Sequence, residues 1–231
     1  MAVTFVRYGD LAAEILARPA GLGAVRVVAV DGPAGSGKTT FAARVATAVR
    51  AAGAGTAEVH TDELLDGWGD LVTFWPRLEE WVLGPLRRGV AGSYRRYDWY
   101  TGGFEQRWRP VPVPDVLILE GVSSGRAAIR PELAMLVWVW APPGLRLTRC
   151  LERDGEAIRP ELLAWMGAEA AHFGVDRPAE HADVLVAGAA GGSVPEGDSG
   201  FLGDISGWTP FDTLRDDPRD TPVRGRGGRT P

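Results

Sequence analysis

The feature that most constrains this chain is a glycine-rich segment, residues 32–39, that reads Gly-x-x-x-x-Gly-Lys-Thr. It directly follows an apolar, β-branched run at residues 25–30, which is typical of a strand buried in a parallel sheet. Residues 41–52 are rich in alanine and precede Gly53, so they predict a helix with a glycine cap. The alternative is a glycine turn that merely precedes a helix, but the order of strand, loop and helix favours a phosphate-binding loop.

Lys38, inside this loop, is the only lysine among the 25 lysine and arginine residues of the chain. A compact ammonium on a flexible stem reaches between the β- and γ-phosphates of a nucleotide, where a planar guanidinium fits less well. The hydroxyl of Thr39 is placed to ligate Mg²⁺. We therefore expect ATP and Mg²⁺ as cofactors, with the nucleotide held by Gly32, Pro33, Ala34, Gly35, Ser36, Gly37, Lys38, Thr39 and Thr40.

Short apolar runs alternate with helical patterns along the rest of the chain. The helical patterns lie at residues 75–88, 145–153 and 160–173, and a leading helix is expected within residues 1–23. The runs that predict further strands are 57–60, 116–119, 136–140 and 184–186. This alternation predicts the α/β class, with a mostly parallel sheet that helices cover on both faces.

The composition changes near residue 188, which suggests one domain over residues 1–188 followed by a tail. Residues 189–231 are rich in Gly, Pro, Asp and Arg and carry few apolar groups, so they bury too little surface to repay the entropy of ordering. We expect a flexible tail there. Its apolar residues could form a short docking patch, made of Phe201, Leu202, Ile205, Trp208 and Phe211.

Charge and composition exclude several classes of partner. A net charge of −5 with interspersed acids and bases gives no basic face for a nucleic acid. The longest apolar run, residues 135–141, is far shorter than the ~20 residues that cross a bilayer, and we expect a cytoplasmic protein without membrane contacts. The sequence leaves the oligomeric state open. The single cysteine and the three histidines show no pattern typical of catalysis, so we expect structural roles for Cys150, His60, His172 and His181.

Two acidic residues follow predicted strands and are expected at the same edge of the sheet. Glu120 ends the apolar run 116–119, as in a Walker B element, where it can hold Mg²⁺ or a water. Asp62 follows the second strand, where a carboxylate can accept the proton of an attacking hydroxyl. The alternatives are a strand that simply ends in an exposed acid and a helix cap, and Glu63 is the neighbour that could be confused with Asp62.

Three arginines, Arg146, Arg149 and Arg153, recur at spacings of three and four, so they share one face of a helix. Guanidinium groups on such a face can stabilise the charge that phosphoryl transfer spreads over the phosphate oxygens. The alternative is a solvated charged face paired with Glu152 and Asp154.

Aromatic and ionisable residues are interleaved between residues 94 and 108. Aromatic faces stack on a ring, and a carboxylate accepts hydrogen bonds from sugar hydroxyls. We expect the acceptor to be bound here by Tyr97, Asp98 and Arg107, together with Asp62, although several of these aromatics could instead be core residues.

Taken together, these segments resemble the uridine kinase-like branch of the P-loop kinases over roughly residues 24–188. The resemblance rests on the loop from Asp31 to Thr40, on Asp62 and on the Tyr97-Asp98 pair. It also includes the segments 117–121, 146–154 and 181–186. One departure concerns residues 101–107, which contain no histidine where the family usually has one that helps to read a pyrimidine.

The resemblance implies a five-stranded parallel core with Mg-ATP as phosphoryl donor. It also implies that Asp62 is the base, that Asp98 contacts the sugar of the acceptor, and that a lid around residues 144–156 closes over the nucleotide. We therefore expect an ATP-dependent kinase acting on a hydroxyl of a small acceptor such as a nucleoside. The alternatives are a kinase for a nucleoside monophosphate, a sugar acid or a vitamin precursor, and a nucleotide-dependent switch that acts through a protein partner.

Overall fold

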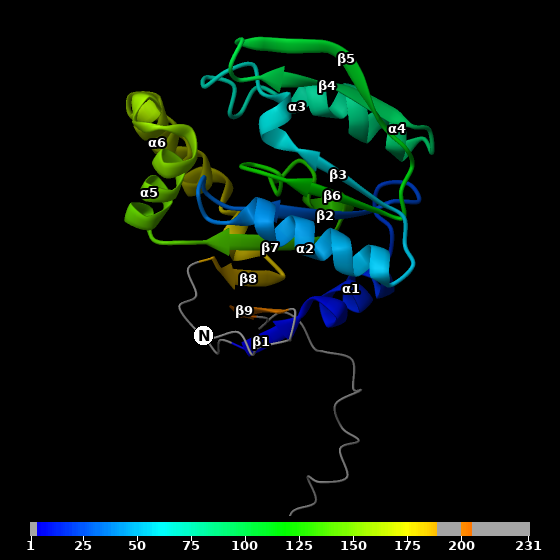
Figure 1. Cartoon of the computed structure of the whole chain (residues 1–231). Coiled ribbons are helices and arrows are strands. Elements are labelled where there is room, and N and C mark those ends of the chain that lie inside the picture. Colours follow the sequence, from blue (N-terminus) through cyan, green and yellow to red (C-terminus); the bar gives the residue numbers. More distant parts are fainter. Residues whose placement is uncertain (1–3, 189–199, 205–231) are drawn as a thin grey trace, which may run out of the picture.

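Five parallel strands form the centre of the structure (Figure 1). In spatial order they are β3 (Thr56–His60), β6 (Val116–Glu120), β2 (Arg26–Asp31), β7 (Leu133–Trp140) and β8 (Val184–Ala187). The computed structural model describes residues 4–188 and 200–204. Because all five strands run in the same direction, their carboxyl ends meet at one edge, where open α/β sheets bind ligands. The predicted α/β fold with a mostly parallel sheet is confirmed.

Two antiparallel strands extend this sheet beyond β8. Strand β9 (Gly200–Asp204) pairs with β8, and β1 (Thr4–Arg7) pairs with β9, which makes seven strands in all. Residues 200–204 lie in the segment 189–231, for which the sequence predicted a flexible tail, so the prediction does not hold for these five residues. Phe201 of the predicted docking patch is buried and stacks edge-on against Phe41, with ring centroids 5.0 Å apart. Ile205, Trp208 and Phe211 lie outside the described residues.

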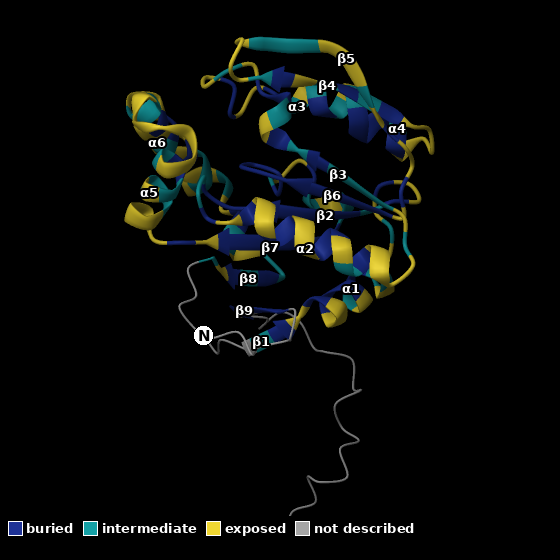
Figure 2. Ribbon diagram, viewed as in Figure 1, coloured by how far each residue is buried: buried dark blue, intermediate teal, exposed yellow. Residues whose placement is uncertain are grey.

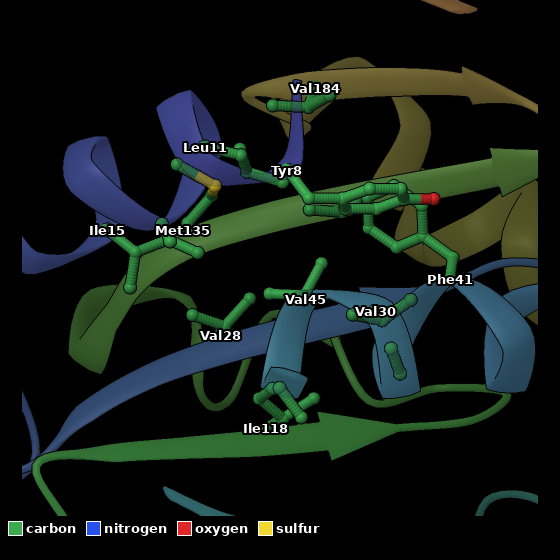
Figure 3. Close-up of a cluster of buried hydrophobic side chains, with 14 of the residues drawn as sticks. Tyr8, Leu11, Ile15, Val28, Val30, Phe41, Val45, Ile118, Met135 and Val184 are labelled. Carbon is green, nitrogen blue, oxygen red and sulfur yellow. The ribbon is translucent and has the colours of Figure 1, made fainter. Parts of the chain in front are cut away.

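One face of the sheet is covered by α1 (Tyr8–Ala17) and α2 (Lys38–Ala51). Alternate strand residues point to it, so that Val28 and Val30 belong to this core whereas Val27 belongs to the core of the other face. Figure 3 shows Val28 and Val30 facing side chains of the two helices between the layers. The outward side of α2 is exposed, as the alternating colours of Figure 2 show.

The opposite face is covered by a helical segment, on which a hairpin packs, and by Trp165 and Phe173 from the helix of residues 159–176. The segment consists of α3 (Trp75–Leu78), a π-helical turn η2 (Glu79–Leu83) and α4 (Gly84–Arg87), and it matches the helix predicted over residues 75–88. The hairpin consists of β4 (Gly92–Asp98) and β5 (Gly103–Val111), which pair antiparallel in a separate sheet. The sequence analysis did not predict this hairpin.

A pair of helices follows β7 at the carboxyl edge of the sheet (Figure 1). They are α5 (Pro143–Asp154) and α6 (Arg159–Asp176), separated by the 3₁₀ turn η4 (Glu156–Ile158). Three further 3₁₀ turns connect other elements: η1 (Thr61–Leu64), η3 (Arg130–Glu132) and η5 (Pro178–His181). Among the residues that the structure describes, no helix combines the length and apolarity needed to cross a membrane.

Candidate active site

A cleft of about 920 Å³ opens at the carboxyl edge of the parallel strands. Its floor is the loop between β2 and α2, and the ends of β3 and β6 lie beside that floor. The turn of the β4–β5 hairpin and helices α5 and α6 form the walls. The cleft therefore combines segments from across the chain, at the place where the strand order predicts a ligand.

The loop of residues 32–39, for which the sequence predicts phosphate binding and which we call the phosphate loop, has glycines at positions that exclude a side chain. Gly32 and Gly35 have φ values of 142° and 75°, in the region that side chains rarely adopt. A Cβ atom on Gly32 would lie 2.1 Å from the carbonyl oxygen of Val139, and one on Gly35 would lie 2.5 Å from that of Arg146. The 14-residue helix α2 begins directly after this loop at Lys38, so its positive end faces the cleft.

Lys38 and Thr39, which the sequence analysis expects at the phosphates and Mg²⁺, both line the cleft. The Lys38 side chain is buried, and its ammonium donates a hydrogen bond of 3.0 Å to the carbonyl oxygen of Pro33. The ammonium thus lies against the loop that is predicted to bind the phosphates of a nucleotide.

Asp31 holds the phosphate loop through hydrogen bonds to backbone N–H groups. Its carboxylate accepts hydrogen bonds from the backbone N–H groups of Gly32 (2.6 Å), Ser123 (2.9 Å) and Gly125 (2.9 Å). Complete burial raises the pKa of Asp31 to about 6, although these N–H groups and the charge of Lys38 oppose the shift. The carboxylate therefore ties the phosphate loop to the segment that follows β6.

Glu120 stands at the end of β6 and lines the cleft, where the sequence placed it. His60 lies opposite it in the parallel pairing of β3 with β6, and its Nδ1 is 2.7 Å from Oε2 of Glu120. This hydrogen bond raises the pKa of His60 to about 9, so the imidazole is positively charged at neutral pH. The sequence analysis gave His60 only a structural role, because a single sequence does not reveal which residues of two strands stand side by side.

The structure distinguishes Asp62 from its neighbour. Asp62 lines the cleft, whereas Glu63 accepts a hydrogen bond from the Tyr94 hydroxyl and forms an ion pair with Arg96 at 3.2 Å. The Trp99 indole N–H donates to the backbone oxygen of Asp62 at 3.2 Å. Asp62 is exposed, but desolvation by the surrounding protein raises the pKa of its carboxyl, and the nearby charge of Glu120 raises it further, whereas His60 and Lys38 oppose the shift.

The three arginines of α5 have different surroundings. Arg149 and Arg153 line the cleft, and Arg149 donates to the carbonyl oxygen of Gly188 at 3.0 Å. Arg153 forms an ion pair with Asp154. Arg146 does not line the cleft; its guanidinium forms an ion pair with Glu169 at 2.7 Å. The helical spacing therefore placed two of the three arginines at the cleft, and closure of residues 144–156 as a lid stays a prediction.

The residues expected to bind the acceptor lie elsewhere. Tyr97 is buried against Trp99 and Phe104. Asp98 accepts hydrogen bonds from the Thr101 hydroxyl and the Tyr100 N–H inside the hairpin turn, and these bonds lower the pKa of its carboxyl. Arg107 lies beside a separate hollow next to β3. The structure does not bring these three side chains into the cleft with Asp62.

Aromatic side chains from other positions line the cleft instead of these three residues, and we call them the aromatic wall. The tryptophans Trp68, Trp99 and Trp165 line the cleft. Trp68 contacts the other two edge-on, with centroid distances of 5.1 Å to Trp99 and 6.0 Å to Trp165. The exposed Tyr100 lies beside them. The sequence analysis missed this wall because its members come from three separate segments, and only Trp99 and Tyr100 fell inside the aromatic stretch.

The groups on the floor of the cleft suit a magnesium–nucleotide. The first backbone N–H groups of α2, which have no partner within the helix, and the Lys38 ammonium complement phosphate oxygens. Thr39 and Glu120 offer one hydroxyl and one carboxylate in the same cleft. Mg²⁺ usually takes only one or two protein ligands and completes its shell with phosphate and water, so this donor set fits it.

No family model matches the chain, and no curated protein matches its sequence. Comparison with solved structures does find similar folds. A protein described as a possible uridine kinase, from Bacillus stearothermophilus, superimposes with a TM-score of 0.58 at 22% identity, over 78% of this chain and 96% of that one. A protein from Silicibacter sp. TM1040, thought to be a fructose transport system kinase, gives a TM-score of 0.51 at 18% identity, over 72% of this chain and 95% of that one. The chain thus has the fold of the uridine kinase-like P-loop kinases.

Proposed function

We propose that this protein is an ATP-dependent kinase that transfers the γ-phosphoryl group to a hydroxyl of a small, uncharged, ring-bearing acceptor such as a nucleoside. One observation carries the proposal: a phosphate loop with its lysine, a carboxylate and an aromatic wall line the same cleft. The first suits a nucleotide, the second suits a hydroxyl nucleophile, and the third suits the ring of an acceptor.

In this mechanism the loop N–H groups and Lys38 bind the phosphates, and Arg149 and Arg153 neutralise charge from the side of α5. Asp62 accepts the hydrogen bond of the acceptor hydroxyl, orients its oxygen towards the γ-phosphorus and takes up its proton. The bond between the γ-phosphorus and the bridging oxygen breaks as the new oxygen–phosphorus bond forms, and ADP leaves. Mg²⁺ held by Thr39 and Glu120 would supply further neutralisation of phosphate charge.

The charges around the cleft favour an uncharged acceptor. Of the residues that line it, the cationic ones are Lys38, Arg149 and Arg153, which belong to the phosphate loop, α2 and α5. The far wall is made of tryptophans together with Leu65 and Leu162. A nucleoside monophosphate or a sugar acid would need a cation there to bind its anionic group.

The experiment is an acceptor panel with Mg-ATP. Nucleosides, nucleoside monophosphates, sugar acids, vitamin precursors and polyols are added separately, and ADP release and the phosphorylated product are measured by mass spectrometry. We expect ADP release to depend on an uncharged, ring-bearing alcohol. If ADP release is unchanged by every acceptor but responds to a protein partner, the protein is a nucleotide switch and the proposal is wrong.

A further inference from the structure

A buried ion pair forms hydrogen bonds with the backbone of the phosphate loop from outside the cleft. Glu169, on α6, is 1% exposed, and its Oε2 accepts a hydrogen bond of 2.9 Å from the N–H of Ala34, 135 positions earlier in the chain. Its Oε1 accepts from Arg146 at 2.7 Å. The same guanidinium nitrogen of Arg146 donates to the carbonyl oxygen of Ala34 at 3.3 Å. Both backbone groups of this loop residue are therefore held by the pair, which we name the Glu169–Arg146 clamp.

Backbone atoms of α5 and of Gly188 also pack closely against the same side of the phosphate loop. The carbonyl oxygen of Arg146 lies where a Cβ atom on Gly35 would stand, at 2.5 Å. A Cβ atom on Gly188, at the end of β8, would lie 1.8 Å from the carbonyl oxygen of Ser36. Arg149 bridges these neighbours by donating to the oxygens of Gly35 (3.4 Å) and Gly188 (3.0 Å). The outer side of the loop is thus packed against α5, α6 and the end of β8, and its inner side faces the cleft.

Stability alone is a weak reason for such a pair. Burying two charges costs desolvation that their attraction roughly offsets, and apolar residues of similar size often serve as well or better. What an apolar pair could not do is accept the N–H of Ala34 and donate to its carbonyl. The specific contribution of the clamp is therefore the conformation of the loop.

We propose that Glu169 and Arg146 are positioning residues that hold the phosphate loop in its nucleotide-binding shape. This rests on the proposed function in one respect only, namely that the loop binds Mg-nucleotide. It also reassigns Arg146, which the sequence placed among the groups that contact phosphate. The same helix supplies Trp165 to the aromatic wall, one turn before Glu169, so α6 fixes the loop and the wall relative to each other.

The test compares Glu169→Gln with wild-type protein. Glutamine keeps the size of the side chain but has one acceptor oxygen for two donors, so the clamp loses one charge-assisted bond. We expect Mg-ATP and Mg-ADP to bind about tenfold more weakly by calorimetry, the size of one hydrogen bond to a charged group. In nucleotide-free protein, hydrogen exchange of the peptide that covers residues 31–37 speeds up, while the KM for the acceptor changes little.

The chain offers a matched control in Asp183→Asn. Asp183 also bridges an arginine and a backbone N–H, accepting from Arg18 at 2.8 Å and from the N–H of Leu136 at 2.7 Å. It precedes β8 at the edge of the sheet opposite the cleft. We expect this variant to lower Tm in the same way as Glu169→Gln, with nucleotide affinity and loop exchange unchanged.

A double variant, Glu169→Met with Arg146→Met, separates positioning from stability. Replacing both charges removes the unpaired partner, so Tm recovers towards wild type, whereas nucleotide affinity stays about tenfold weaker. This variant decides the question if Glu169→Gln fails to fold. Wild-type affinity, tighter binding, or recovery of affinity together with Tm would each overturn the clamp. Wild-type protein that does not bind Mg-ATP would instead refute the proposed function.

Discussion

The two halves of the cleft are built in different ways. The half that we propose for the phosphates, the phosphate half, is built on one continuous segment, Asp31 to Thr40, whose shape depends on glycine backbone and on the start of α2. The half that we propose for the acceptor, the acceptor half, is assembled from side chains of separate segments, with Trp68, Trp99 and Trp165 as its main surface. A local backbone structure leaves a short sequence motif, whereas a surface made of dispersed side chains leaves none. The contrast predicts that substitutions in the two halves affect different steps.

The largest effect is expected from Lys38→Met, which removes the cation of the phosphate half. In the proposed mechanism both nucleotide binding and transfer depend on this ammonium, so we expect Mg-ATP to bind about 100-fold more weakly and kcat/KM to fall by about 10⁴-fold or more. Calorimetry and a steady-state assay measure the two quantities. Arg50→Met is the control, because Arg50 lies in the last turn of the same helix and pairs with Glu58 at the surface. If Lys38→Met binds and consumes Mg-ATP as wild type does, the role of the phosphate half is refuted.

Asp62→Asn should separate the two halves. Asparagine keeps the shape but accepts no proton, so we expect transfer to fall by about 10²- to 10³-fold while Mg-ATP binds within about twofold of wild type. Single-turnover kinetics with saturating acceptor measures the loss. Glu63→Gln serves as the control: it breaks contacts to Tyr94 and Arg96, so it lowers Tm and leaves transfer intact. Retained transfer in Asp62→Asn would remove this residue from its role.

The parts of the molecule that the sequence predicted correctly are those with a local signal. The parallel strands are apolar runs, and the glycine loop between β2 and α2 is a contiguous pattern of residues. The β4–β5 hairpin was missed because the adjacent arginines Arg95 and Arg96, where the pairing is irregular, interrupt the alternation of β4, and because β5 buries only Val111. Strand β9 was missed because its glycines suggested a tail, yet a Cβ atom on Gly203 would lie 2.8 Å from the carbonyl oxygen of Leu185, so this close pairing requires glycine.

The same reasoning applies to the candidate site. Helical spacing predicted that Arg146, Arg149 and Arg153 share a face, but it could not indicate that Glu169, 23 positions further on, would take Arg146 as its partner. Nor could it indicate that Asp98 turns inward to its own hairpin turn while Trp68 and Trp165 meet across the cleft. Such pairings depend on how α6 and the hairpin pack on the sheet.

Trp68→Ala tests the acceptor half alone. Trp68 is 37% exposed and contacts both other tryptophans, so its removal reduces the ring surface offered to an acceptor. We expect the KM for the acceptor to rise about tenfold while nucleotide affinity stays unchanged. Trp108→Ala is the matched control: Trp108 is 49% exposed on β5 and packs on Trp81 outside the cleft. Equal effects of the two substitutions would show that the wall does not bind the acceptor.

The smallest effect that we predict is one on stability, and it is expected from Asp31→Asn. Burial raises the pKa of Asp31 from 3.8 to about 6 in the folded protein, so between these pH values the folded state keeps a proton that the unfolded state has lost. The contribution of this group to the free energy of unfolding is therefore greatest below about pH 4 and declines as pH rises towards 6. The asparagine variant lacks this decline.

We expect the Tm of wild type minus that of Asp31→Asn to shrink between pH 4 and 6 and then to level off. Asp10→Asn, at an exposed site on α1, is the charge-matched control. A Tm difference that stays constant or widens over this range would mean that the Asp31 carboxylate is ionised throughout, stabilised by the N–H groups of the phosphate loop more strongly than burial opposes it.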